Sequence, residues 1–289
     1  MGQGPLAGDD FQARFRKRIL AGCVLAAFVA WMYWPVGCEL VRQWMASDVA
    51  SYGILIPPIC TYVVWLQRKT TFGLPASPDL RGLFLVFLAC LCFLVGSLTS
   101  GFFIRQVSFV VLLAGLVWTF WGVPRLKSLS FPLILLLTMI PLPAVVLNKL
   151  ASPLQLLASE IATRVAQGAG VSVYRGGNVI QLATLRLGVA EACSGLSSLF
   201  TLIVAALLLG HLHRSSVLVR SLLVAVSVPI AIAVNVLRIG ATAILADRNP
   251  SLALGFYHSF SGWLIFLVGF GLLWLVSGIA GRMASGANA

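Results

Sequence analysis

The fold of this chain is decided by residues Val217–Leu245, which read VLVRSLLVAVSVPIAIAVNVLRIGATAIL. A helix needs about 20 predominantly apolar residues to cross the hydrocarbon core of a bilayer, and this stretch exceeds that length. We therefore predict an all-α polytopic membrane protein with about eight transmembrane helices. The other expected spans are Ile19–Val36, Gly53–Leu66, Gly82–Ser100, Val107–Val123, Leu129–Leu147, Leu196–Gly210 and Tyr257–Ile279.

The composition favours a membrane-embedded chain over a soluble one. Of the 289 residues, 60% are hydrophobic and 10% are charged, and the mean hydropathy is +0.99. A soluble domain carries about 25% charged residues, so this chain could not cover a surface in water. The same apolar content excludes intrinsic disorder. The net charge of +12 does not indicate nucleic-acid binding, because the basic residues lie in short gaps between apolar stretches. We expect membrane lipid and no nucleic acid as partners.

Basic residues in the gaps also predict the orientation of the chain. Four of them, Arg14 to Arg18, precede the first span, and its end at Ala30–Trp34 offers no cleavage site of small residues. Alternating spans then place 12 basic and three acidic residues on the cytoplasmic side, against eight and five outside. This bias follows the positive-inside rule. The predicted organisation is a cytoplasmic segment 1–18, a single transmembrane domain 19–281 and a cytoplasmic tail 282–289.

Proline and glycine indicate where the spans should be irregular. Pro57 and Pro58 lie inside the short second span, so we expect a kink or an earlier start there. Residues Gly101–Gln106 should form a tight turn between spans three and four. Arg105 belongs to that predicted turn, because a charge is costly at the centre of a bilayer.

One long gap, the outer loop 148–195, separates spans five and six. In its first half, Asn148–Gln167, apolar residues recur at helical spacing, which suits an amphipathic helix on the membrane surface. In its second half, Arg175-Gly176-Gly177-Asn178 is a turn signal between apolar runs. We therefore expect a small β-hairpin on the outer face before span six.

Cys193 stands apart from the other cysteines of the chain. It lies between Glu191 and Ser194, where a polar outer segment enters span six. The start of a helix carries partial positive charge, which favours the nucleophilic thiolate. The alternatives are a helix-start cysteine without a role and a disulfide with Cys38. The cysteines inside spans are expected to be small core residues: Cys23, Cys60, Cys90 and Cys92.

Arg238 is embedded in the apolar sequence Ala231–Ala246, in the outer half of span seven. A charge there is expensive without a partner or a polar cavity, so we interpret Arg238 as functional. The alternatives are snorkelling to the outer interface and pairing with Glu191 or Asp247. Asn235 lies one turn earlier on the same helix face and could hold the guanidinium in place.

His258 opens span eight at the same outer boundary. The other histidines, His211 and His213, fall on the cytoplasmic side, about 30 Å of hydrocarbon away. No carboxylate or cysteine accompanies them, so a solvated loop is favoured over a metal site.

Cys193, Arg238 and His258 thus converge on one membrane face and form a cysteine acyl-transfer set. His258 can accept the thiol proton and return it to the leaving amine, while Arg238 can stabilise the oxyanion. Ser194 is the weaker candidate nucleophile, because serine needs stronger base assistance. We predict no metal and no organic cofactor.

Several segments follow one another along the chain: Asp48–Pro57, Met139-Ile140-Pro141-Leu142-Pro143, Gly176-Gly177-Asn178, Glu191-Ala192-Cys193-Ser194-Gly195-Leu196, Asn235-Val236-Leu237-Arg238-Ile239 and Tyr257-His258. In this order they resemble the exosortase/archaeosortase family. Ser197, where many relatives have Arg, and Tyr52, where many have His, depart from the family pattern. The resemblance runs from about Asp48 to about Trp263.

The resemblance implies a thiol protease and transpeptidase with Cys193, Arg238 and His258 as its catalytic set. The implied substrates are secreted PEP-CTERM proteins, whose C-terminal sorting signal has a Pro-Glu-Pro motif, an apolar helix and a basic tail. The enzyme would cut this signal at the outer face of the inner membrane, in cells with exopolysaccharide systems. It would pass the acyl group to a surface acceptor that the resemblance does not name. The alternatives are a membrane hydrolase without transfer and a non-enzymatic transporter that uses the buried Arg and His.

Overall fold

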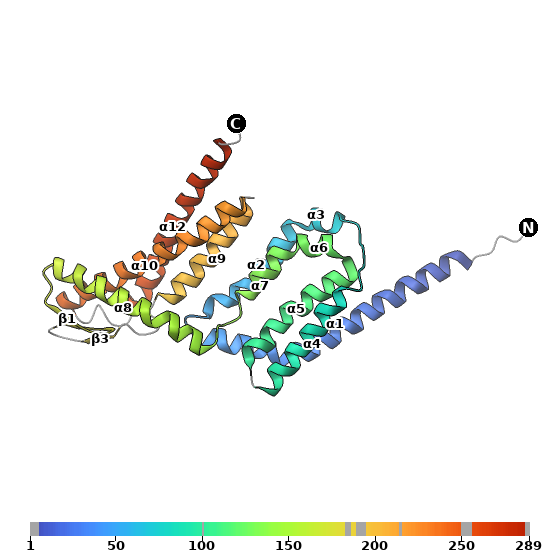
Figure 1. The fold of residues 1–289 in the computed structure, drawn as a ribbon, viewed down its shortest axis with the longest axis horizontal. Helices are drawn as coiled ribbons and strands as arrows, with labels where there is room; N and C mark the ends of the chain where they lie inside the picture. Colours follow the sequence, from blue (N-terminus) through green and yellow to red (C-terminus); the bar gives the residue numbers. More distant parts are fainter. Residues whose placement is uncertain are drawn as a thin grey trace, which may run out of the picture.

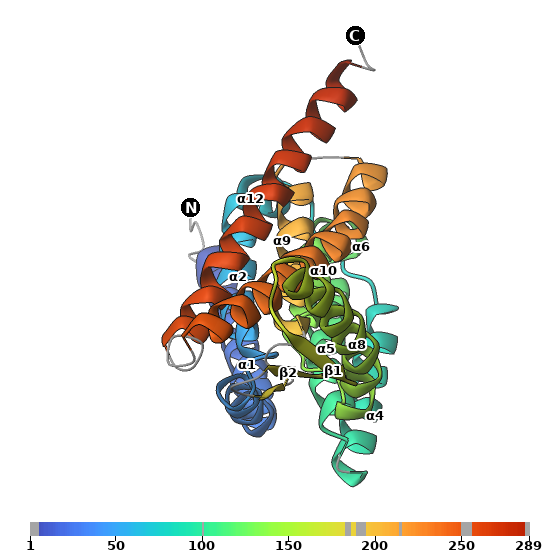
Figure 2. The ribbon, with the colours of Figure 1, turned by 90° about the vertical axis from the view of Figure 1, so that its left-hand side faces the viewer.

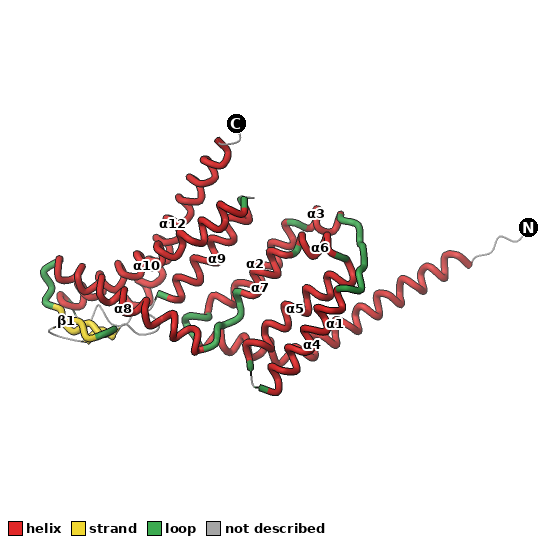
Figure 3. The backbone as a smooth tube through the Cα atoms, in the orientation of Figure 1, coloured by secondary structure: helices red, strands yellow, loops and turns green. Residues whose placement is uncertain are grey.

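The computed structural model describes residues 6–99, 101–182, 186–188, 195–213, 216–249 and 256–286. Most of this chain is helical, and the helices form two groups (Figures 1 and 3). The first group contains α1 (Leu6–Ala46), the 3₁₀ helix η1 (Ser51–Leu55), α2 (Ile56–Leu66), α3 (Arg68–Gly73), α4 (Gly82–Leu98), α5 (Phe102–Trp121), α6 (Val123–Ser128) and α7 (Ser130–Leu137). The second contains α8 (Ala144–Gly168), β1 (Val173–Gly176), β2 (Val179–Leu182), β3 (Arg186–Gly188), α9 (Leu196–Leu212), α10 (Val217–Arg248) and α12 (Phe256–Gly286).

Helices occur at all eight expected spans, but they differ in length. Within the described residues, four segments are long and apolar enough to cross a membrane: Gly22–Ala46, Phe102–Trp121, Val217–Arg248 and Gly262–Ala280. Three further apolar helical segments are shorter: Ser51–Leu66, Gly82–Leu98 and Leu196–Leu212. The count of eight full-length spans therefore stays a prediction.

The expected fifth span, Leu129–Leu147, is wrong as a continuous helix. Helix α7 ends at Leu137, and the chain is not helical again until Ala144. Pro141 and Pro143 explain the break, because proline has no backbone N–H and disfavours the helical conformation of the preceding residue. The same logic gives the expected early start of the second span. There η1 precedes α2, and both prolines of α2 lie in its first turn.

Helices α4 and α5 pack against each other through small residues. Gly82, Ala89 and Gly96 are buried and recur every seventh position along α4. A Cβ at Gly96 would lie 2.8 Å from the backbone nitrogen of Arg105, so the two backbones approach closely. The expected turn Gly101–Gln106 is too long, because α5 already begins at Phe102. Arg105 therefore lies in the first turn of a helix rather than in a turn.

The outer loop contains the predicted helix and the predicted hairpin. Strands β1 and β2 are antiparallel, and Gly177 in the turn between them has φ +67°. Such a positive φ favours glycine in a two-residue hairpin turn. The sequence did not predict β3, which pairs with β2 to complete a three-stranded sheet in the order β1-β2-β3.

The small sheet lies beside α8, and α8 in turn packs along α10 (Figure 2). Ile180 of β2 is fully buried, and the Ser159 hydroxyl of α8 donates to the carbonyl oxygen of Gly177 at 3.1 Å. Short side chains allow the two helices to approach. The buried alanines of this contact are Ala158, Ala162 and Ala166 of α8 and Ala243 and Ala246 of α10.

Helix α9 connects the two groups. Val204 of α9 belongs to the hydrophobic cluster of the first group, together with Tyr33 and Leu135. Leu202 and Ala206 of the same helix belong to a cluster with α10 and α12. The predicted nucleophile, Cys193, comes shortly before α9 in the sequence. The helix that follows it is therefore packed against both helix groups.

Candidate functional site

The described part of the chain covers the predicted catalytic residues unequally. The Arg238 side chain is described, and His258 is described as part of α12 but without its side chain. Cys193 lies outside the described residues, as do Glu191 and Ser194. The geometry of the site therefore has to be built from Asn235, Arg238 and the residues that flank the other positions.

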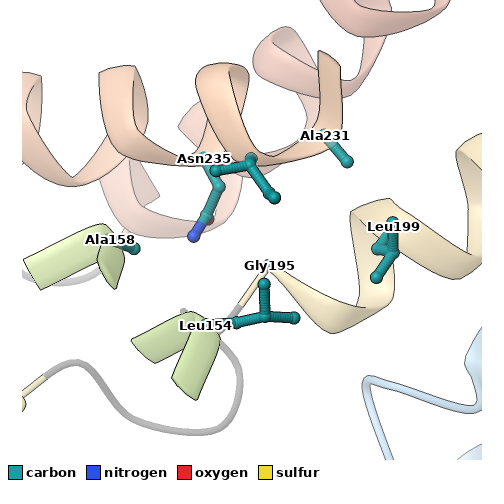
Figure 4. A pocket seen from close by; sticks show the side chains of 7 residues that line it. Leu154, Ala158, Gly195, Leu199, Ala231 and Asn235 are labelled. Carbon is teal, nitrogen blue, oxygen red and sulfur yellow. The ribbon is translucent and has the colours of Figure 1, made fainter. Parts of the chain in front are cut away.

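Asn235 of α10 packs directly against the start of α9. Its side chain is 3% exposed, and a Cβ at Gly195 would lie 2.8 Å from Asn235 Nδ2 and 2.9 Å from its Cγ. Gly195 is the N-cap of α9 and has φ +78°, in the left-handed region that favours glycine. The amide that the sequence assigned to the guanidinium thus also contacts the backbone two residues after Cys193 (Figure 4).

Helices α8, α9 and α10 meet at this point around a cavity of about 10 Å³. A volume of this size is close to the smallest that holds one water molecule. The cavity is therefore a packed junction and not a ligand pocket. Its lining residues are Leu154, Ala158, Gly195, Leu199, Ala231, Ile232 and Asn235 (Figure 4).

Arg238 lies three residues after Asn235 and extends to α12. A Cβ at Gly262 would lie 3.2 Å from Arg238 Nη2 and 3.3 Å from its Cζ, so the guanidinium sits against the Gly262 backbone. Gly262 follows His258 by four residues in α12, which is about one helical turn. The Arg238 side chain thus reaches the helix that carries His258, at the neighbouring turn.

The turn between α1 and α2 consists of residues 47–55 and includes η1. It contacts the first turn of α9. The Ser197 hydroxyl donates to the carbonyl oxygen of Asp48 at 3.1 Å. The Tyr52 and Phe200 rings are stacked, with centroids 6.1 Å apart and an interplanar angle of 24°. The two departures from the family pattern, Ser197 and Tyr52, therefore lie in one contact. Sequence reasoning missed Phe200, whose only signal was its position one turn after Ser197.

Trp44 links the early motif to the proline-rich motif. Its indole N–H donates to the carbonyl oxygen of Met139 at 2.8 Å. A Cβ at Gly53 would overlap the indole ring, so only glycine fits at this position of the early motif. Segments that are about 90 residues apart in sequence, around Asp48 and Met139, are therefore held against each other.

The other two histidines lie at the C-terminal end of α9 and make different contacts. The expectation of a solvated loop is wrong for His211, which lies in α9, stacks on Phe131 at 3.7 Å and hydrogen-bonds Gln67. His213 is exposed and hydrogen-bonds the Ser277 hydroxyl through Nδ1 at 3.1 Å. Among the described residues, no group of three or more His, Cys, Asp or Glu could hold a metal ion. Cys38 is a free thiol.

One family model matches most of the chain. The family model described as transmembrane exosortase (Exosortase_EpsH) matches residues 44–275. The chain belongs to the exosortase family. The matched range begins at Trp44 and includes Gly195, Asn235, Arg238 and Gly262, whose contacts are described above. Neither a curated protein nor a solved structure matches the chain. As an exosortase-family chain with several long apolar helices, it is a multi-pass membrane protein.

Proposed function

We propose that this exosortase-family protein is a membrane-embedded cysteine transpeptidase with Cys193, His258 and Arg238 as its catalytic residues. The observation that carries the proposal is one turn of α10. There Asn235 packs against Gly195, two residues after Cys193, and Arg238 sits against Gly262, four residues after His258. A single helical turn thus contacts the segments that flank both other candidate residues.

In the proposed reaction, His258 accepts the proton of the Cys193 thiol, and the thiolate attacks the carbonyl carbon of the scissile peptide bond. Arg238 stabilises the oxyanion of the tetrahedral intermediate. The intermediate collapses to a thioester as His258 returns the proton to the leaving amine. An acceptor nucleophile then attacks the thioester carbonyl, and its proton restores the Cys193 thiol.

The family supports a secreted protein with a C-terminal sorting signal as the substrate. Its apolar helix would enter laterally from lipid and lie against α12, which presents apolar side chains outward. Trp263 is 61% exposed and Leu267 is 42% exposed. The basic tail of the signal would stay at the cytoplasmic side, under the charge bias that orients the enzyme. We infer that cleavage takes place at the outer face of the inner membrane.

The test of the nucleophile uses Cys193→Ala and Cys193→Ser in cells that express a tagged substrate. Both variants should accumulate the unprocessed substrate, whereas Cys38→Ala, a change to another cysteine outside the proposed site, should process it normally. Arg238→Lys and His258→Gln should also abolish processing at unchanged protein level. Normal processing by Cys193→Ala would show that the nucleophile is misassigned.

Transfer and hydrolysis differ in the product. The mass of the mature substrate's C-terminus should include an added acceptor group if the thioester is passed on. A free carboxylate at that terminus would instead assign the protein as a hydrolase. Both outcomes keep Cys193 as the nucleophile, so this measurement tests only the second half of the reaction.

A further inference from the structure

Within the described residues, the N-cap of α9 makes no side-chain hydrogen bond to the first turn of the helix. Gly195 is the N-cap residue, and glycine has no side chain that could accept a hydrogen bond from the first-turn N–H groups. Helix α10, by comparison, begins with Ser216, whose hydroxyl accepts a bond from the Val219 N–H. Gly195 contributes no such side-chain bond, so contacts with other elements can help to hold the first turn of α9.

Two such contacts approach the first turn of α9 from different elements. From α10, the Asn235 side chain lies against Gly195. From the turn between α1 and α2, the Asp48 carbonyl oxygen accepts the Ser197 hydroxyl, and Tyr52 stacks on Phe200. Ser197 and Phe200 are three residues apart, so they share one face of α9.

The turn that contacts α9 is itself firmly held. Two backbone hydrogen bonds close it, from Ala50 N to Ser47 O at 3.0 Å and from Gly53 N to Ala50 O at 2.9 Å. The Ser51 hydroxyl also donates to the Asp48 carbonyl oxygen, at 2.9 Å. The turn therefore provides a rigid reference surface, because most of its own bonds do not involve α9.

We propose that Ser197 and Tyr52 are positioning residues, which fix the first turn of α9 and thereby the placement of Cys193. The inference rests on the proposed function, since it assigns these residues to the cysteine that attacks the substrate. They act through α9 and not on the substrate. A misplaced nucleophile costs rate more than binding, and a shift of about 1 Å costs up to about 100-fold.

The test uses purified full-length protein in lipid nanodiscs and a sorting-signal peptide. Ser197→Ala removes the bond to Asp48, and Tyr52→Leu removes the stack on Phe200. Each should lower kcat about 10-fold or more while KM changes less than about twofold. The conservative variants Ser197→Thr and Tyr52→Phe keep the hydroxyl and the ring, and should retain nearly all of kcat.

A second readout follows the thiol without any substrate. The rate of Cys193 alkylation by iodoacetamide is measured by peptide mass spectrometry. It should differ from the rate in the unchanged protein in Ser197→Ala and equal that rate in Ser197→Thr. The matched control is Ser128→Ala. It removes a hydroxyl contact of 2.7 Å with Thr71 that joins α3 and α6 and does not involve α9. This control should leave both kcat and the alkylation rate unchanged.

The outcomes separate the two proposals. If Ser197→Ala and Tyr52→Leu match Ser128→Ala in kcat and in alkylation rate, the positioning role is overturned while the nucleophile assignment stands. The role is also overturned if kcat falls only in proportion to thermal stability in all three variants. If Cys193→Ala still processes the substrate, the proposed function itself has failed.

Discussion

Replacing Gly195 by Ala measures how tightly α9 and α10 meet at the site. The backbone of Gly195 has φ +78°, and an L-residue in this region costs about 1–2 kcal/mol. The new Cβ would also lie 2.8 Å from Asn235 Nδ2, closer than real Cβ contacts come. Asn235 must therefore shift, and overpacking of this kind costs about 1–3 kcal/mol. We expect the free energy of unfolding to fall by about 2–5 kcal/mol in total.

A second glycine separates the two costs. Gly170 has φ +82°, and no atom lies within 4 Å of the position that its Cβ would take. Gly170→Ala therefore carries only the conformational cost, of about 1–2 kcal/mol. The double variant Gly195→Ala with Asn235→Ala should recover the overpacking part, because contacting residues are energetically coupled.

The assay is reversible denaturant unfolding of the purified protein in detergent, followed by tryptophan fluorescence. Processing of a tagged substrate is measured in parallel and should be lost in Gly195→Ala, because Asn235 is displaced at the site. Equal destabilisation by Gly195→Ala and Gly170→Ala would refute the close contact with Asn235. So would the absence of coupling in the double variant.

Two further predictions concern α12 and the small sheet. Gly262→Val should push the Arg238 guanidinium aside and lower processing about 10-fold or more, with little loss of stability because a long side chain can move. Gly271→Val, with open space around its Cβ, should process normally, and equal activity of the two variants would contradict the contact. Ile180→Ala should lower the free energy of unfolding by about 2–5 kcal/mol, because Ile180 is fully buried. Tyr174→Ala, at a side chain that is 70% exposed, should change the free energy of unfolding by less than about 0.5 kcal/mol. An equally small loss in Ile180→Ala would show that the sheet does not pack on α8.

Features with a local signal could be predicted from the sequence. The hairpin followed from Gly177 and Asn178 between two apolar runs, because turn chemistry acts over a few residues. Helix α8 followed from apolar spacing in the same way. The fifth span failed because its mean apolar character concealed Pro141 and Pro143, which end the helix where hydropathy alone predicts its continuation.

Contacts between distant segments could not be predicted by the same reasoning. Ser197 and Asp48 are separated by 149 positions, and no local pattern relates a hydroxyl to a distant backbone carbonyl. Gly262 appears neutral in an apolar sequence, although it provides the space in which the Arg238 guanidinium lies. The sequence identified the chemical groups, whereas packing between helices determines which of their neighbours touch.

The shared position of α9 has a consequence for biosynthesis. Val204 completes the cluster that contains Tyr33 and Leu135, yet the ribosome makes it some 70 residues after α7 begins. The nascent chain is synthesised from its N-terminus. The first helix group therefore lacks the contact with Val204 until α9 has been inserted into the bilayer. If the ribosome stalled within the hairpin, the surface that Val204 covers would stay accessible to lipid or to a chaperone.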